Sequence, residues 1–343
     1  MDHELPTTRR AVLGGIAATT AIGLAGCTSG SDGETTVRMG GGPQGTATFA
    51  SSQALQKVVS DHGENVSIST QETSDTGVSN FRLYDNGEID AGGFDNFVGT
   101  QAAAGTDAFE DAPVSELPLQ GFFYVLAHLY IVTPADSDIE TTDDLAGRRV
   151  WLNPPGTSIR VPTDAVFRES GLYEDIEIRE MGRSDLPGAI EEGRVDAAVV
   201  YGVNFKTLPG WVSELDSRFE LRAVELTDAF REAIDRTGGT AGERIEAYGW
   251  SQDIGTEELD TWNVVGQFRF GDQLSEAAVE EITRIAHEHN DEIIEANAIF
   301  PSFEDPAAMT NGVIPDQPIH PGVAAYWREL GVWNDEWTVG SLE

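Results

Sequence analysis

Two five-residue stretches, GEIDA at residues 87–91 and GRVDA at residues 193–197, indicate that the fold is repeated within the chain. Each follows a segment with helical periodicity and leads into an apolar stretch typical of a strand. Outward from them the elements come in the same order twice: strand, glycine-containing loop, helix, strand, helix, turn, strand. Such alternation favours parallel sheets covered by helices, and about 310 mature residues are enough for two domains. The sequence therefore predicts an α/β protein with two similar lobes.

The two halves have the following predicted elements. In the first half they are strand TVRMG (36–40), helix 51–62, strand NVSISTQE (65–72), helix 78–86 and a strand from 91. In the second half they are strand RRVWLN (148–153), a helix ending at Ser170, strand EIRE (177–180), helix 186–192 and strand AAVVYG (197–202).

The loop MGGGPQGTATF (39–49) contains Gly40-x-Gly42-x-x-Gly45 between a strand and a helix. With Glu72 at the end of the second strand, this pattern resembles a dinucleotide fingerprint and leaves open an exported NAD(P)-dependent oxidoreductase. Pro43 within the loop, and the absence of the spacing from PPGTS (154–158) in the second half, argue against it. The two loops share a glycine turn before a helix N-terminus, which favours anions. We therefore expect a clamp for a small carboxylate between the lobes.

The N-terminus has the features of an export signal. Arg9 and Arg10 precede an apolar run from Ala11 to Ala25, which as a helix spans roughly 22 Å, short of a ~30 Å hydrocarbon core. The adjacent arginines indicate a twin-arginine signal over residues 1–27, and Cys27 lies where a lipoprotein is processed. We expect lipidation of Cys27 to anchor the exported protein on the extracellular face of the membrane, with residues 28–35 as a flexible tether.

The composition is strongly acidic, with 21 Lys and Arg against 59 Asp and Glu and a formal net charge of -38. At molar salt the Debye length is about 3 Å, so this surface is typical of a halophile's protein. A hydrophobic fraction of 40% argues against a disordered chain. The charge argues against a nucleic-acid partner, and a chain whose one thiol is Cys27 has no disulfide.

Apart from the Gly40-x-Gly42-x-x-Gly45 loop, common motifs for catalysis, nucleotide phosphates and metals are missing from the sequence. His-Glu-x-x-His, Gly-x-Ser-x-Gly and a Walker loop do not occur. His287 and His289 are two residues apart on a predicted helix and so face different sides, which argues against a metal pair. His128 and His320 are isolated and are interpreted as structural. We expect no cofactor, no metal and no enzymatic activity.

Five segments in order carry a resemblance to a known family. They are MGGGPQGTATF, FRLYDNGEIDAGGFDN (81–96), SDIETTDDLAGRRVWLNPPGTS (137–158), RVDAAVVYG (194–202) and IHPGVAAYW (319–327). From Thr36 to Trp327 the chain resembles the TAXI family, extracytoplasmic solute-binding proteins of TRAP transporters with a type II periplasmic-binding-protein fold. The resemblance implies capture of a small organic acid or acidic amino acid, often glutamate-like, and delivery to a membrane permease driven by an ion gradient.

The resemblance also implies which residues bind the ligand: Gln44, Gly45, Thr46, Phe49, Asp95, Asn96, Gly156, Thr157, Ser158, Ile159 and Tyr201. Some positions depart from the family pattern, namely Gln44, Thr48, Asp95, Arg160 and Asp164. Arg160 has two interpretations. Its guanidinium either grips a ligand carboxylate in the cleft or pairs with Asp164 one turn later on a helix surface.

The predicted organisation is a first lobe over residues 36–129, a second lobe over 130–262, and a return to the first lobe with C-terminal helices over 263–343. We expect the chain crossings near 130–133 and 262–268 to act as a hinge, and the lobes to close on the ligand. A sensor or adhesion ectodomain with the same binding fold is a further alternative.

Overall fold

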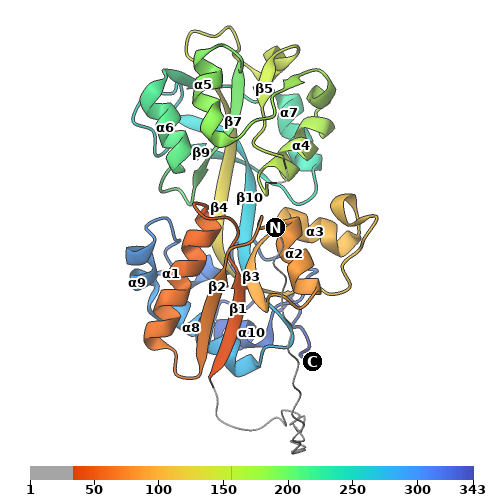
Figure 1. Cartoon of the computed structure of the whole chain (residues 1–343), viewed down its shortest axis with the longest axis vertical. Helices are drawn as coiled ribbons and strands as arrows, with labels where there is room; N and C mark the ends of the chain where they lie inside the picture. The colour runs from red at the N-terminus through yellow and green to blue at the C-terminus, as the bar shows by residue number, and fades with distance from the viewer. Residues whose placement is uncertain (1–33, 156) are drawn as a thin grey trace, which may run out of the picture. The chain divides into compact units, whose positions relative to one another are not determined.

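The computed structural model describes residues 34–155 and 157–343; the predicted signal segment, Cys27 and most of the tether lie outside them. Within the described residues, no helix is both long and apolar enough to cross a membrane. Two lobes of strands flanked by helices are visible in Figure 1, and two long strands, β4 (Leu119–Pro134) and β10 (Glu258–Phe270), run through both. The arrangement agrees with the predicted pair of α/β lobes.

The first lobe holds the two ends of the described chain. Its strands β1 (Thr35–Gly40), β2 (Val66–Gln71) and β3 (Ala91–Asp95) are parallel and follow the order β2-β1-β3-β10. Its helices are α1 (Ala47–His62), α2 (Val78–Asp85), α3 (Asn96–Ala104), α8 (Glu276–Glu288), α9 (Asn290–Ala296) and α10 (Pro321–Leu330).

The second lobe repeats this order. Strands β5 (Arg149–Trp151), β6 (Glu177–Ile178) and β7 (Ala197–Val203) are parallel and follow the order β6-β5-β7-β4. The other elements of this lobe are α4 (Arg160–Glu169), α5 (Leu186–Glu191), α6 (Gly210–Arg218), α7 (Asp228–Arg236), β8 (Leu221–Ala223) and β9 (Gly242–Glu246). In each lobe the first strand of the repeat is therefore central, with the second strand on one side and the third on the other.

An arginine–aspartate lock explains the aspartate of the repeated GEIDA and GRVDA turns. Asp90 accepts hydrogen bonds from the backbone N–H and the Nε of Arg38, both at 2.9 Å, and from its Nη2 at 2.5 Å. Asp196 makes the same three contacts with Arg149, with backbone N and Nε at 2.8 Å. Each lock fixes the turn before the third strand to the first strand of its lobe. The side-chain hydrogen bonds of Arg149 hold the pKa of Asp196 below its ordinary value.

The connecting strands β4 and β10 pair antiparallel from Leu129↔Trp262 to Leu119↔Phe270, with register shifts around Gln267. Strand β10 pairs with β9 over 258–262 and with β3 over 266–270, while β4 joins β7 over 127–132. The crossing on β4 therefore lies before Ala127 and not at the predicted 130–133, because those residues already belong to the second-lobe ladder. On β10 the crossing falls inside the predicted 262–268.

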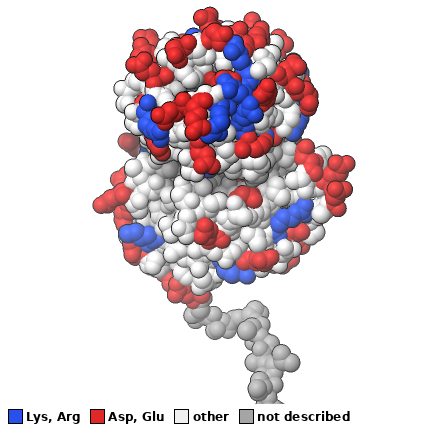
Figure 2. All heavy atoms as spheres, turned by 45° about the horizontal axis from the view of Figure 1, so that its top comes forward, with Lys and Arg blue, Asp and Glu red and all other residues white. Residues whose placement is uncertain are grey.

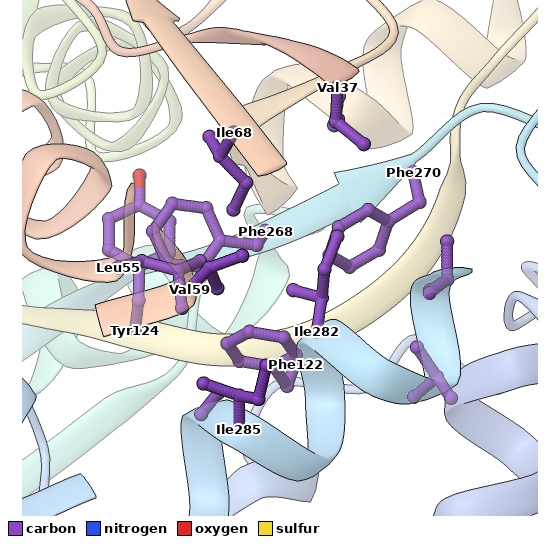
Figure 3. Close-up of a cluster of buried hydrophobic side chains, with 14 of the residues drawn as sticks. Val37, Leu55, Val59, Ile68, Phe122, Tyr124, Phe268, Phe270, Ile282 and Ile285 are labelled. Atoms are coloured by element: carbon purple, nitrogen blue, oxygen red, sulfur yellow. The ribbon is translucent and has the colours of Figure 1, made fainter. Parts of the chain in front are cut away.

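The first-lobe core lies between the sheet and helices α1 and α8. Figure 3 shows part of it, including Leu55 and Val59 of α1, Ile282 and Ile285 of α8 and the aromatic rings of β4 and β10. Helix α1 begins at Ala47, four residues before the predicted start, because Thr46 caps it and apolar periodicity begins only one turn later. The second lobe has separate clusters around Phe167 and around Trp151.

Candidate functional site

A cavity of about 430 Å³ lies between the lobes. Loops that follow strands β1, β2 and β5 reach it, as does the end of β3, so it lies at the carboxyl edge of both parallel sheets. In open α/β sheets this edge is where ligands bind, and the volume suits a small solute. Five residues of the connecting strands also line it: Tyr124, Val125, Ala127, Val264 and Gly266.

The first-lobe loop places a helix N-terminus at this cavity. Gly42 and Gly45 have positive φ angles of 76° and 78°, which let the chain turn into α1. The Oγ1 of Thr46 accepts a hydrogen bond from the Phe49 N–H at 3.2 Å. The N–H groups of Ala47 and Thr48 make no hydrogen bond within the described part of the chain, and both residues line the cavity. Two free donors at the positive end of α1 are therefore available to an anion.

The second-lobe loop reaches the cavity from the other side. Thr157, Ser158 and Ile159 line it, and Thr157 Oγ1 donates to the Pro154 carbonyl at 2.9 Å. Among the described residues, the N–H group of Ser158 has no acceptor. Gly156, predicted to belong to this loop, lies outside the described residues. Both lobes thus offer main-chain donors to the same space.

Arg183 is the cavity's cation. It is the one Lys or Arg among the described residues that line the cavity, and no carboxylate within the described residues forms an ion pair with it. Its Cζ lies 5.7 Å from the ring centroid of Trp211, which also lines the cavity, and its buried Nε has no partner. Trp211 contacts Tyr201 with ring centroids 5.8 Å apart. The second lobe therefore presents an unpaired guanidinium on an aromatic wall.

Asp95 and Tyr124 form the opposite wall, from the first lobe. Asp95 is 3% exposed, and its Oδ1 accepts from the Val98 N–H at 2.9 Å. Burial raises the pKa of Asp95 to about 7, against the opposing effects of backbone N–H groups and the charge of Arg269. The Tyr124 hydroxyl lies 2.9 Å from Thr48 Oγ1. Below about neutral pH the Asp95 carboxyl is uncharged and does not repel a carboxylate.

Eight predicted ligand residues are together in the cavity wall: Gln44, Gly45, Thr46, Asp95, Thr157, Ser158, Ile159 and Tyr201. Two others, Phe49 and Asn96, do not line this cavity. Phe49 follows Thr48 on α1 and so faces another side of the helix, close to Gly41 and Thr70. Asn96 is held by the Gly312 carbonyl, 2.5 Å from its Nδ2, and by Arg269, whose Nη2 donates to its Oδ1 at 2.9 Å.

Arg160 is also absent from the cavity wall. Its guanidinium is buried and pairs with Asp164 one turn later and with Glu180 Oε1 at 3.0 Å. It also donates to the Asn153 carbonyl at 2.8 Å. Burial lowers the pKa of Arg160, but the ion pairs with Glu180 and Asp164 outweigh it and leave the pKa raised. The Asp164 interpretation therefore describes this side chain, although it is buried and not on the helix surface.

Residues of the Gly40-x-Gly42-x-x-Gly45 loop make contacts within the protein that a nucleotide site does not require. Gln44 Nε2 donates to Glu72 Oε2 at 2.9 Å, so the carboxylate needed for a ribose hydroxyl already has a partner. The Gly42 N–H donates to Thr73 Oγ1 at 2.8 Å. A Cβ on Gly40 would meet Asn80 and Ile89 at 3.0 Å, so this glycine serves packing.

The sequence pattern did not indicate four of the cavity residues, Arg183, Trp211, Tyr124 and Asp75. The position of Arg183 carried a signal, because it follows the short strand β6 and the carboxyl ends of parallel strands meet at one edge. Tyr124 lies in the middle of a long apolar strand, where nothing in the local pattern separates a cavity residue from a core residue. Burial raises the pKa of Asp75 even though the Ser79 and Gly77 N–H groups bond to it.

Comparison with known proteins identifies the family. The model of the NMT1-like family matches residues 39–331. The chain belongs to the NMT1-like family. Among solved structures, this NMT1-like chain is similar to the periplasmic aliphatic sulphonate-binding protein SsuA from Escherichia coli, with 15% identity over 76% of this chain and 77% of that chain and a TM-score of 0.41.

Two further structures are similar to this NMT1-like chain. The alkanesulfonate-binding protein SsuA from Xanthomonas axonopodis pv. citri, bound to MOPS, shares 15% identity over 90% of this chain and 98% of that chain, with a TM-score of 0.42. Lactococcal OpuAC, in a closed conformation with glycine betaine, shares 15% identity over 77% and 99%, with a TM-score of 0.42. The predicted fold class is confirmed: the strand orders and the two lobes are those of an α/β periplasmic-binding-protein-like fold.

Proposed function

We propose that this protein is an extracytoplasmic solute-binding protein that captures a small carboxylate-bearing solute between its lobes and presents it to a membrane transporter. The observation that carries the proposal is Arg183, an unpaired guanidinium in a cavity that main-chain donors of both lobes also reach. A guanidinium binds a carboxylate with two parallel hydrogen bonds, and free helix N–H groups bind a second acidic group.

The ligand class follows from how the polar groups are distributed. Arg183 lies on the second-lobe wall, while the free N–H groups of Ala47 and Thr48 lie on the first-lobe wall. A small diacid or an acidic amino acid carries two anionic ends that reach both walls. Closure of the lobes around such a ligand removes it from water and draws the two walls together. Binding without chemical change is sufficient for this role.

The transporter and the anchor extend this proposal. The resemblance to the TAXI family favours a TRAP-type permease, and Cys27 after the arginine-led apolar segment favours a lipid anchor on the extracellular face of the membrane. Figure 2 shows acidic side chains over the surface of both lobes, in keeping with the formal charge of -38 and with a protein that works in molar salt.

A thermal-shift screen in molar salt tests the binding function. Organic diacids, acidic and neutral amino acids, an alkanesulfonate and a reduced nicotinamide dinucleotide are compared with buffer alone. A diacid or acidic amino acid at a hundred times its Kd adds about 2.7 kcal/mol to the stability of the folded state. Stabilisation by the dinucleotide alone would contradict the proposal and favour the oxidoreductase.

Arg183→Gln tests the assigned contact once a ligand stabilises the protein. Loss of a charged hydrogen-bonding partner costs about 1.5 to 3 kcal/mol, so the Kd rises by roughly ten- to a hundredfold. The matched control is Arg179→Gln, four residues earlier in the chain, because Arg179 pairs with Glu177 at 2.7 Å and does not line the cavity. The assignment is refuted when the two variants bind with the same affinity as the parent protein.

A further inference from the structure

Two histidines and a glutamate from distant parts of the sequence meet at the end of α1 that lies away from the cavity. His62 is the last residue of α1, His289 lies between α8 and α9, and Glu292 is in the first turn of α9. His62 Nε2 lies 3.0 Å from Glu292 Oε2, and His289 Nδ1 lies 3.0 Å from Glu292 Oε1. The two imidazole rings stack with centroids 3.5 Å apart and an interplanar angle of 16°.

The three side chains supply donor atoms at separations that suit a metal ion. One ligand atom from each residue can be chosen so that all three lie within 4.8 Å of one another. Around a zinc ion with bonds of about 2.1 Å, neighbouring ligand atoms lie roughly 3.0 to 3.4 Å apart, and each nitrogen lies at such a distance from a different oxygen of Glu292. Because the two imidazole planes are nearly parallel, metal binding requires the rings to rotate out of the stack so that one nitrogen of each points at the ion. We propose that His62, His289 and Glu292 form a binding site for a divalent transition-metal ion of the zinc class.

The donor set selects the class of metal. Two imidazole nitrogens and a carboxylate oxygen suit zinc, cobalt, nickel and copper, whereas calcium and magnesium require six or more ligands that are mostly oxygen. Three protein ligands leave at least one position for water, so the ion exchanges with solvent. The side chains are 29%, 31% and 43% exposed for His62, His289 and Glu292, so an ion reaches them without local unfolding.

The site is separate from the cavity. None of its residues lines the cavity, and the 16 residues of α1 place Thr46 and His62 about 24 Å apart along the helix. The ion would join the end of α1 to the start of α9, two helices that pack together and are also linked by a hydrogen bond from Asn297 Nδ2, just after α9, to Ser51 Oγ of α1 at 3.0 Å. Metal binding therefore stabilises the folded first lobe, and it does so whether or not the cavity binds a carboxylate.

The test measures metal binding by the mature chain in molar salt after treatment with a chelator and its removal. We expect one Zn²⁺ per chain by calorimetry, a rise in melting temperature with Zn²⁺ but not with Mg²⁺ or Ca²⁺, and visible absorption bands with Co²⁺. His62→Gln, His289→Gln and Glu292→Gln each raise the Kd for Zn²⁺ at least tenfold. His287→Gln is the matched control, because His287 Nδ1 contacts the Tyr326 hydroxyl at 2.8 Å and takes no part in the cluster.

Two results overturn the proposal: a parent protein that binds no Zn²⁺, or triad variants that bind it as tightly as His287→Gln does. The second result assigns the ion to the acidic surface. Circular dichroism shows whether each variant is folded, and the Co²⁺ spectrum of the parent protein reports imidazole ligation even when a variant is unstable. Carboxylate binding at Arg183 is measured on the same samples, so failure at one site is distinguished from failure at the other.

Discussion

Replacing Asp95 with asparagine should change how the stability of the unliganded protein depends on pH. Burial raises the pKa of Asp95 from 3.8 to about 7, so the native state binds this proton more tightly than the unfolded state does. The resulting stabilisation is fully present below the unfolded pKa of 3.8 and is lost as pH rises to about 7. A shift of about 3 pH units corresponds to ~4 kcal/mol, of which more than half is lost between about pH 5 and about pH 8.

The assay is denaturant unfolding in molar salt at those two pH values. The variant is compared with the parent, so that the contributions of all other titratable groups to the pH dependence cancel. The substituted side chain would keep the cap on α3, because the amide oxygen of an asparagine accepts the same backbone N–H. We expect the free energy of unfolding of the Asp95→Asn variant, relative to that of the parent, to rise by about 2 to 3 kcal/mol from about pH 5 to about pH 8.

Asp196→Asn is the control with the opposite sign. Hydrogen bonds from Arg149 lower the pKa of Asp196, so its contribution is present above the unfolded pKa and is lost as pH falls through the lowered value. The Asp196→Asn variant should therefore lose stability relative to the parent in mildly acidic and neutral solution. A stability difference between Asp95→Asn and the parent that is independent of pH would refute the reasoning, since it would mean that Asp95 ionises as easily in the native state as in the unfolded chain.

Three further predictions follow from the fold, the composition and the N-terminus. Gly266→Ala places a Cβ 2.6 Å from Val125 Cγ1 and 2.9 Å from the Tyr124 hydroxyl, so it should destabilise the protein by about 1 to 3 kcal/mol and weaken ligand binding; unchanged unfolding and affinity would contradict this. Lowering the salt to ~0.1 M lengthens the Debye length to about 10 Å and should lower the melting temperature, because the carboxylates then repel one another. An unchanged melting temperature would show that the charge of -38 does not destabilise the fold. Cys27→Ser should leave export intact and remove the lipid, and fractionation with the membrane after this change would argue for another anchor.

The fold was predictable because its signals are local and occur twice. GEIDA and GRVDA each precede the third strand of a lobe, and the locks with Arg38 and Arg149 give the repeated aspartate a structural reason. The crossing on β4 was placed too late because the apolar run from Leu119 to Pro134 is continuous in the sequence. Periodicity cannot report where a strand exchanges one partner for another, since both partners require the same apolar side chains.

The candidate site was predictable only where a loop motif marks it. The loops after β1 and β5 combine glycine, threonine or serine before a helix, and most of their predicted residues lie in the cavity wall. The sequence could not decide between the two interpretations of Arg160, because the predicted ligand loop directly precedes it and Asp164 follows one helical turn later. The position of the guanidinium depends on Glu180, which is distant in the sequence and pairs with it. His62 and His289 are 227 residues apart, so their stacking depends on tertiary packing that the sequence pattern does not contain.

The two strands that run through both lobes have a consequence for cooperativity. Strands β4 and β10 remain paired with each other from Leu129↔Trp262 to Leu119↔Phe270, so one ladder of hydrogen bonds continues from one core into the other. Melting either core exposes half of that ladder and removes support from the remaining half. Two lobes joined by flexible linkers would melt independently, each with its own midpoint. Here the shared ladder should make calorimetric unfolding a single transition, with an enthalpy that scales with the whole described chain and not with one lobe.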